Sequence, residues 1–165
     1  MASLIEAIIF DGAPQTAAVP DGLKTVPLTA GLTMLPLTDK ALEHLGAADP
    51  NDDRIKPGWI LRRAVATLAE HMSADRHVLY VFGETFGGPG TQEAVGWYEG
   101  RLFYGPAGTC DLQADREPGY QVAPHRDSAM NGGLRAMGVQ AAPGVDEYET
   151  IGLTRHRMID DWITT

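Results

Sequence analysis

The residues of this sequence best suited to holding a ligand flank a glycine-rich segment. The stretch from Gly83 to Gly105 reads GETFGGPGTQEAVGWYEGRLFYG and contains seven glycines. Glu84 and Thr85 precede its densest glycines, and Thr91 and Gln92 follow them. Backbone N–H groups of such a segment can cradle a phosphate, and polar side chains beside it can line a recognition site. Alternatively, the glycines only allow the chain to turn.

The nucleotide-binding alternative fails on spacing. A P-loop requires a lysine and then Ser or Thr directly after its last glycine, whereas here Thr91 follows Gly90 at once. A dinucleotide fingerprint requires a helix after the glycines, and the residues from Glu93 to Tyr98 have the composition of a strand. We therefore predict that Gly87 to Gly90 form a turn between two strands and that no cofactor binds there.

Other side chains with metal-binding or catalytic chemistry are dispersed along the chain. The five histidines occur singly, without the H-E-x-x-H or H-x-H spacing of metal sites. They are His44, His71, His77, His125 and His156. Cys110 has no nearby histidine or helix start in the sequence to lower its pKa, so we expect a buried, unreactive thiol. The sequence thus predicts no metal site and no catalytic residue.

One enzymatic alternative stays open. A small hydrolase or transferase could use Glu84 with His125 or His156 in a pocket beside the glycine turn. This alternative requires a carboxylate and an imidazole, distant in sequence, to come within hydrogen-bonding reach of each other.

Strands are predicted where apolar and β-branched residues cluster. Leu4 to Phe10 and Gly31 to Leu37 are two candidates, and Val78 to Phe82 is a continuous apolar run typical of a central strand buried on both faces. Glu93 to Tyr98 and the strand after it flank Glu99-Gly100, a pair favoured in type I′ hairpin turns.

Three helices are predicted beside these strands. Thr38 can cap a two-turn helix that ends before Gly46. Apolar residues spaced three and four apart predict the longest helix, from Gly58 to Ser73. Asp127 or Ser128 can cap a third helix that runs to about Met137, and the two glycines inside it indicate close packing against another element.

No segment has the composition of a linker between domains, although Thr109 to Pro124 is polar and predicts a long irregular loop. We therefore expect a single α+β domain over residues 1–165. Its sheet is mainly antiparallel, with about five strands and about three helices packed on it.

Composition excludes several classes of function. Thirteen Lys and Arg against 22 Asp and Glu give a net charge of −9, which repels nucleic-acid phosphates and anionic lipids. No segment reaches the roughly 18 uninterrupted apolar residues that a membrane helix needs. The single cysteine allows no disulfide within the chain and favours a reducing cytoplasm. We expect another protein as the partner, not nucleic acid or a membrane, and the oligomeric state stays open.

Two segments also carry a resemblance. ETFGGPGTQEAVGWYEG, from Glu84 to Gly100, and DEYETIGLTRHR, from Asp146 to Arg157, resemble segments of small uncharacterised bacterial proteins. Some similar small acidic proteins serve as immunity partners of secreted toxins. The resemblance implies an immunity protein that neutralises a basic toxin through an acidic surface, and it implies no catalytic residue.

The predicted contact surface combines polar groups near the glycine turn with acidic side chains. Its central contacts are Glu84, Gln92 and Trp97, and its rim charges are Asp52, Asp53 and Glu99. Rim charges affect the association rate more than the affinity.

Overall fold

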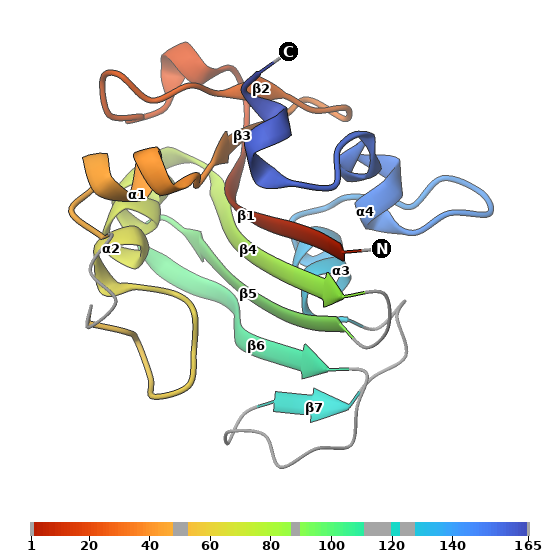
Figure 1. Cartoon of the computed structure of the whole chain (residues 1–165). Helices are drawn as coiled ribbons and strands as arrows, with labels where there is room; N and C mark the ends of the chain where they lie inside the picture. The colour runs from red at the N-terminus through yellow and green to blue at the C-terminus, as the bar shows by residue number, and fades with distance from the viewer. Residues whose placement is uncertain (1, 48–52, 87–89, 111–119, 123–127, 165) are drawn as a thin grey trace.

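The molecule is built around one sheet with helices on both of its faces (Figure 1). The computed structural model describes residues 2–47, 53–86, 90–110, 120–122 and 128–164. The strands are β1 (Ala2–Asp11), β2 (Val26–Pro27), β3 (Leu32–Pro36), β4 (His77–Phe86), β5 (Gly90–Tyr98), β6 (Arg101–Cys110) and β7 (Tyr120–Val122). They pair in the order β2-β3-β1-β4-β5-β6-β7, and every pair is antiparallel except β6 with β7.

The predicted α+β fold with a mainly antiparallel sheet is confirmed. The central position of β4 and the hairpin between β5 and β6 are also as predicted, and both turn residues have positive φ, 51° at Glu99 and 71° at Gly100. The sheet has seven strands, whereas about five were predicted. The prediction missed β2 and β7 because, with two and three residues, they are too short to show an apolar pattern. β6 and β7 also show that the irregular loop predicted from Thr109 to Pro124 was wrong at its start and at residues 120–122.

The structure describes the strands on both sides of the predicted glycine turn, but not the turn itself. Residues 87–89 lie outside the described residues, whereas Thr85 of β4 and Gly90 of β5 pair directly. The described strands on either side are therefore antiparallel neighbours.

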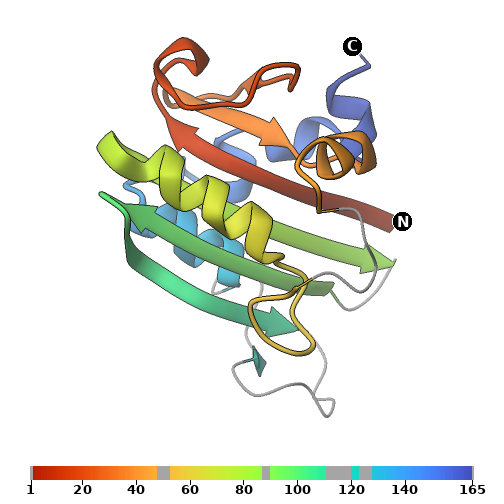
Figure 2. The same ribbon diagram turned by 90° about the vertical axis from the view of Figure 1, so that its left-hand side faces the viewer.

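Two groups of helices cover the two faces of the sheet. α1 (Asp39–His44) and α2 (Arg63–Met72) lie on one face, called here the α2 face; α3 (Ala129–Ala136) and α4 (Glu147–Thr150) lie on the other, the α3 face. Figure 2 shows α2 in front of the sheet and α3 behind it. Short 3-10 helices complete the chain: η1 (Pro14–Thr16), η2 (Ser73–Asp75), η4 (Leu153–Arg155) and η5 (Ile159–Trp162).

Each face has its own apolar core. Phe10 and Tyr80 from the sheet pack with Val65 of α2 on the α2 face, and Ile9 and Leu79 pack with helix α3 on the other. Successive residues of a strand point to opposite faces, so a strand buried on both sides reads as a continuous apolar run. This explains the composition of β1 and β4.

The C-terminal segment completes the core of the α3 face. Ile151, Leu153 and Trp162 are buried there. Leu4 of β1 forms a bridge with Met158, which ties this segment to the sheet.

The outer edge of β6 is only partly covered. β7 pairs with Gly108–Cys110, so within the described residues no strand pairs with the outer edge of residues 101–107. Pro106 lies on this edge and has no backbone N–H to offer an additional strand.

Helix α2 begins later than predicted. The apolar spacing predicted a start at Gly58, but the helix starts at Arg63. The amides of Ile60 and Leu61 donate hydrogen bonds to the carboxylate of Glu93 on β5, at 2.8 and 3.2 Å. These bonds hold the segment before α2 in a non-helical path against the sheet.

Helix α3 packs closely enough on the sheet to require its glycines. The Ser128 hydroxyl caps it by accepting from the Asn131 amide, as predicted. A Cβ on Gly133 would lie 2.8 Å from Cδ1 of Leu79, which is fully buried, and a Cβ on Gly132 would meet the Tyr104 hydroxyl. The predicted close packing is thus made against side chains of β4 and β6.

We predict that Gly133→Ala destabilises the protein by about 1–2 kcal/mol, because overpacking against Leu79 outweighs the gain of up to about 1 kcal/mol in helix propensity. Chemical denaturation measures the change. The control is Ala136→Gly at the exposed end of the same helix, which should cost about 1 kcal/mol by propensity alone. A Gly133→Ala protein as stable as the unaltered chain would contradict the packing explanation.

Candidate functional site

The predicted contact residues divide between the two faces of the sheet. Gln92 and Trp97 both lie on β5, five residues apart, and therefore point to opposite faces. Gln92 lines a cavity on the α3 face together with Glu84, whereas Trp97 lines a groove on the α2 face. The described members of the predicted contact surface thus do not form one surface.

A fully buried carboxylate organises the α2 face. Glu93 is 0% exposed, and its two oxygens accept hydrogen bonds from the amide of Ile60, at 2.8 and 3.1 Å, while one also accepts from the amide of Leu61. Arg54 strengthens the same loop because its Nη1 donates to the carbonyl oxygen of Ile60 at 2.6 Å. Residues 53–62 are therefore held as a fixed loop over β5.

A second carboxylate lies two strands away on the same face. Glu6 of β1 pairs across the sheet with Phe82, which in turn pairs with Glu93. One Glu6 oxygen accepts a hydrogen bond from the Tyr80 hydroxyl at 3.0 Å and lies 3.4 Å from Nη1 of Arg62. The loop before α2 is thus joined to β1 as well as to β5.

Burial is the largest influence on the ionisation of this group. It raises the pKa of Glu6 above 4.5, although the positive charge of Arg62 and the hydrogen bond from Tyr80 act in the opposite direction. Burial and then the nearby charge of Glu6 raise the pKa of Tyr80 well above 10, so the hydroxyl stays protonated and donates to Glu6.

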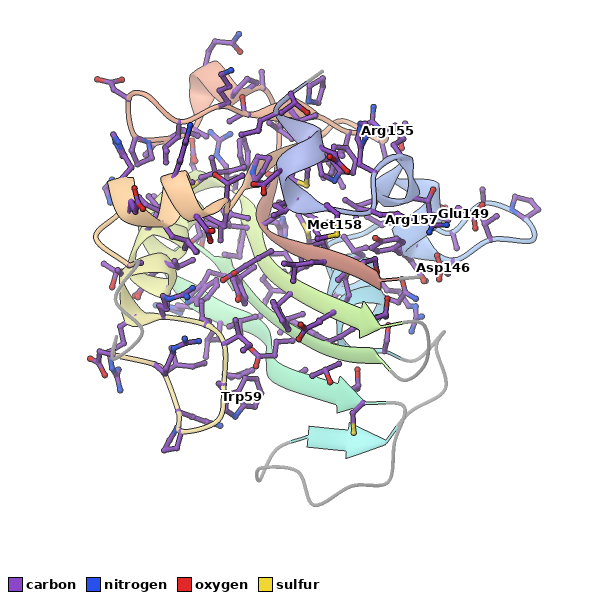
Figure 3. The ribbon with its side chains drawn as sticks, in the orientation of Figure 1. Trp59, Asp146, Glu149, Arg155, Arg157 and Met158 are labelled. Carbon is purple, nitrogen blue, oxygen red and sulfur yellow. The ribbon has the colours of Figure 1, made fainter. Side chains whose placement is uncertain are left out.

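The groove on the α2 face lies between this loop, α2 and the β5–β6 hairpin. Its volume is about 380 Å³. The apolar lining residues are Ile55, Leu61, Val95, Trp97, Leu102 and Pro106. Figure 3 shows Trp59 on the loop before α2, and its ring lies 5.3 Å from Nζ of Lys56, which lines the groove.

The groove combines an apolar floor with exposed edges. Trp97 is 6% exposed, but Leu102, its neighbour across the hairpin, is 54% exposed. Glu70 lines the groove, and the exposed Glu99 precedes Gly100, which also lines it. In the described part of the chain, neither of these two carboxylates has an ion-pair partner.

The remaining predicted residues have other surroundings. Asp53 lies at the start of the loop, and its carboxylate binds Arg63 at 2.8 Å; Asp52 lies outside the described residues. His156 contacts Trp162 edge-on and lines a different cavity from Glu84, and His125 lies outside the described residues. The structure thus does not bring Glu84 and His156 into one cavity.

The sequence carried usable signals for the residues that the prediction missed. Glu93, which was missed, is four residues from the predicted Trp97 in a strand and therefore shares its face, and Glu6, also missed, interrupts an apolar run in β1. A carboxylate at a buried strand position needs hydrogen-bond donors. Which residues supply these donors depends on how the chain folds. They are Ile60 and Leu61 for Glu93, and Tyr80 and Arg62 for Glu6.

Fold and groove together define an α+β protein with an apolar groove on the α2 face of its sheet. In that part of the chain no group of three or more His, Cys, Asp or Glu could hold a metal ion. No described helix combines the length and the apolar character needed to cross a membrane. Comparisons with protein-family models, curated proteins and solved structures found no match for the chain.

We predict that Glu93→Gln lowers the free energy of unfolding by about 1–3 kcal/mol, because glutamine offers one acceptor oxygen to the amides of Ile60 and Leu61 where the carboxyl group offers two. Hydrogen exchange should accelerate at the amides of Ile60 and Leu61. The control is Glu99→Gln at the exposed turn, which should change stability by no more than about 0.5 kcal/mol. Unchanged exchange at both amides in Glu93→Gln would show that the loop is held by other contacts.

We predict a pH-dependent advantage for Glu6→Gln. The folded carboxyl group binds its proton more tightly than the unfolded one, so this group's contribution to stability is present at acid pH and is lost as the pH rises through the raised pKa. Glutamine has no such loss. The free energy of unfolding of Glu6→Gln minus that of the unaltered protein should therefore increase from about pH 4 to about pH 7.

Denaturant titrations at several pH values measure this difference. Tyr80→Phe is the companion variant: it removes a hydrogen bond that favours the carboxylate and should steepen the fall in stability with pH. A constant offset between Glu6→Gln and the unaltered protein at all pH values would contradict a raised pKa.

Proposed function

We propose that this chain is a protein-binding module and that its docking surface is the groove on the α2 face. The observation that carries the proposal is the exposure of Leu102 over an apolar floor that includes Trp97. An apolar groove whose lining includes an exposed leucine is a candidate interaction site. Tryptophan in such a position is the residue type most often found to dominate binding energy.

The groove is prepared for binding before a partner arrives. Its loop wall is held by Glu93 and Arg54, and its floor belongs to the sheet. A rigid surface loses little conformational entropy on association. The uncovered edge of β6 contributes Leu102 and Pro106 to the groove, and the proline disfavours addition of a strand there. A side chain inserted into the groove is the mode of binding that this edge supports.

We infer that the occupant is an apolar segment of a basic protein. The chain has a net charge of −9, and the carboxylates of Glu70 and Glu99 beside the groove have no ion-pair partner among the described residues. Their charges would attract a basic protein and orient it before contact, and the apolar floor would then supply most of the affinity.

A narrower form of the proposal names the kind of partner. The partner would be a basic secreted toxin and this chain the immunity protein that neutralises it in the cytoplasm. The acidic charge, the resemblance of the segments Glu84 to Gly100 and Asp146 to Arg157, and the single cysteine support this form. Purifying the products of adjacent genes and measuring their binding to this protein tests it directly.

We predict that Leu102→Asp weakens partner binding at least about tenfold, because it places a charge in the apolar contact. The tagged protein is first used to isolate the partner from its own cells, and calorimetry with the purified pair then gives the affinity. The matched control is Met158→Asp, since Met158 is also exposed, at 41%, but lies beside β1 (Figure 3). Both substitutions are at exposed sites and should fold normally.

The outcomes separate this proposal from its alternatives. A basic partner that binds the unaltered protein and Met158→Asp equally, but not Leu102→Asp, would support it. Equal binding by all three proteins would place the contact elsewhere. If Leu102→Asp instead dissolves a dimer of this chain in sedimentation experiments, the groove is filled by a second copy and the proposed partner is wrong.

A further inference from the structure

A second cavity lies on the α3 face and shares no described lining residue with the groove. Its volume is about 220 Å³, and it lies between the ends of β1, β4 and β5 and the helices α3 and α4. Both segments singled out in the sequence contribute to its lining. Thr85 and Gln92 come from the glycine-rich segment, and Tyr148 comes from the C-terminal one. Ser3 of β1 completes the polar wall.

We propose that this cavity binds a small uncharged molecule rich in hydroxyl groups, of about the size of a monosaccharide. This site is distinct from the docking groove, and its occupant does not depend on the proposed protein partner.

The wall of the cavity is held in place by hydrogen bonds between α3, α4 and β5. Asn131, which is 1% exposed, donates from Nδ2 to Asp146 at 3.1 Å and accepts at Oδ1 from the amide of Tyr148 at 3.0 Å. Oε1 of Gln92 accepts from the amide of Met130 at 3.0 Å. Figure 3 shows Asp146 and Glu149 together on this side of the molecule. The polar groups are therefore oriented without a ligand.

Several donors in the cavity remain available. The hydroxyls of Ser3 and Thr85 lie 2.7 Å apart, and whichever one accepts keeps its own proton for a ligand. The orientation of Gln92 leaves its Nε2 amide as a donor. The Tyr148 hydroxyl has no hydrogen-bond partner within the described residues. Burial and then the charge of Asp146 raise the pKa of Tyr148 above 10, so its hydroxyl keeps its proton. Hydroxyl and ring oxygens of a sugar match this set.

The lining argues against an anionic ligand. Among the described lining residues there is no Lys, Arg or His. The first amides of α3 are also occupied, because the side chains of Thr109, Gln92 and Ser128 accept from Ala129, Met130 and Asn131. A phosphate or carboxylate would find no cation and no unpaired helix N–H group there.

The volume of the cavity and the apolar part of its wall restrict the choice of ligand further. The volume is below the range of about 300–1,000 Å³ that is usual for drug-sized ligands, so the molecule must be small. Ile5 and Met130 form an apolar part of the wall, and the Tyr148 ring offers a flat apolar face. A sugar ring presents C–H groups on one face and hydroxyls around its edge, which fits such a wall.

The proposal is tested by titrating the whole protein with glucose, galactose, N-acetylglucosamine and inositol, monitored by amide chemical shifts and by saturation transfer to the ligand. At least one probe should shift the Gln92 side-chain amide and the backbone amides of Thr85 and Tyr148. Tyr148→Phe should weaken this binding about three- to tenfold, as expected for loss of one neutral hydrogen bond, without lowering Tm.

Tyr104→Phe provides the matched control. The Tyr104 hydroxyl donates to the carbonyl oxygen of Ala129 at 3.0 Å, so this variant should lose thermal stability and keep its affinity for the probe. The proposal is overturned if no probe shifts these amides, if Tyr148→Phe binds as tightly as the unaltered protein, or if a phosphorylated sugar binds more tightly than its uncharged parent. The last result would show that the site selects anions.

Discussion

The buried side chain of Glu93 joins the loop before α2 to strand β5, and the groove on the α2 face depends on this connection. A carboxyl group at 0% exposure is tolerated only when donors replace the water it has lost, and here the amides of Ile60 and Leu61 do so. These amides belong to the loop before α2. The loop before α2 is thereby joined to β5, and one wall of the groove is joined to its floor.

The sequence could predict the elements whose signals are local. The apolar run of β4, the Glu99-Gly100 turn and the Thr38 and Ser128 caps each depend on a few neighbouring residues. It could not predict where α2 begins, because the start depends on an acceptor 33 residues away. The separation of Gln92 from Trp97 was readable, since an odd spacing within a strand places two side chains on opposite faces. The hydrogen bond between Gln92 and the first turn of α3 could not be predicted from the sequence, because it depends on how the helix packs on the sheet.

Strand β5 therefore contributes to two sites of different chemistry. Its residues on the α2 face, Glu93 and Trp97, build and line an apolar groove, and Gln92 on the other face lines a polar cavity. The apolar groove is suited to a macromolecule that brings its own charges, whereas the polar cavity is suited to a small molecule that is surrounded by donors. A period of two along one strand is enough to keep these environments separate.

The uncovered edge of β6 has a consequence for how these molecules behave at high concentration. Sheets with a long free edge tend to join edge to edge into fibres, because each added strand finds a row of unused donors and acceptors. Pro106 interrupts that row within residues 101–107, and the exposed Arg101 adds a charge at its beginning. Both residues therefore disfavour the addition of a strand at this edge, beside which the apolar side chain of Leu102 is exposed to water.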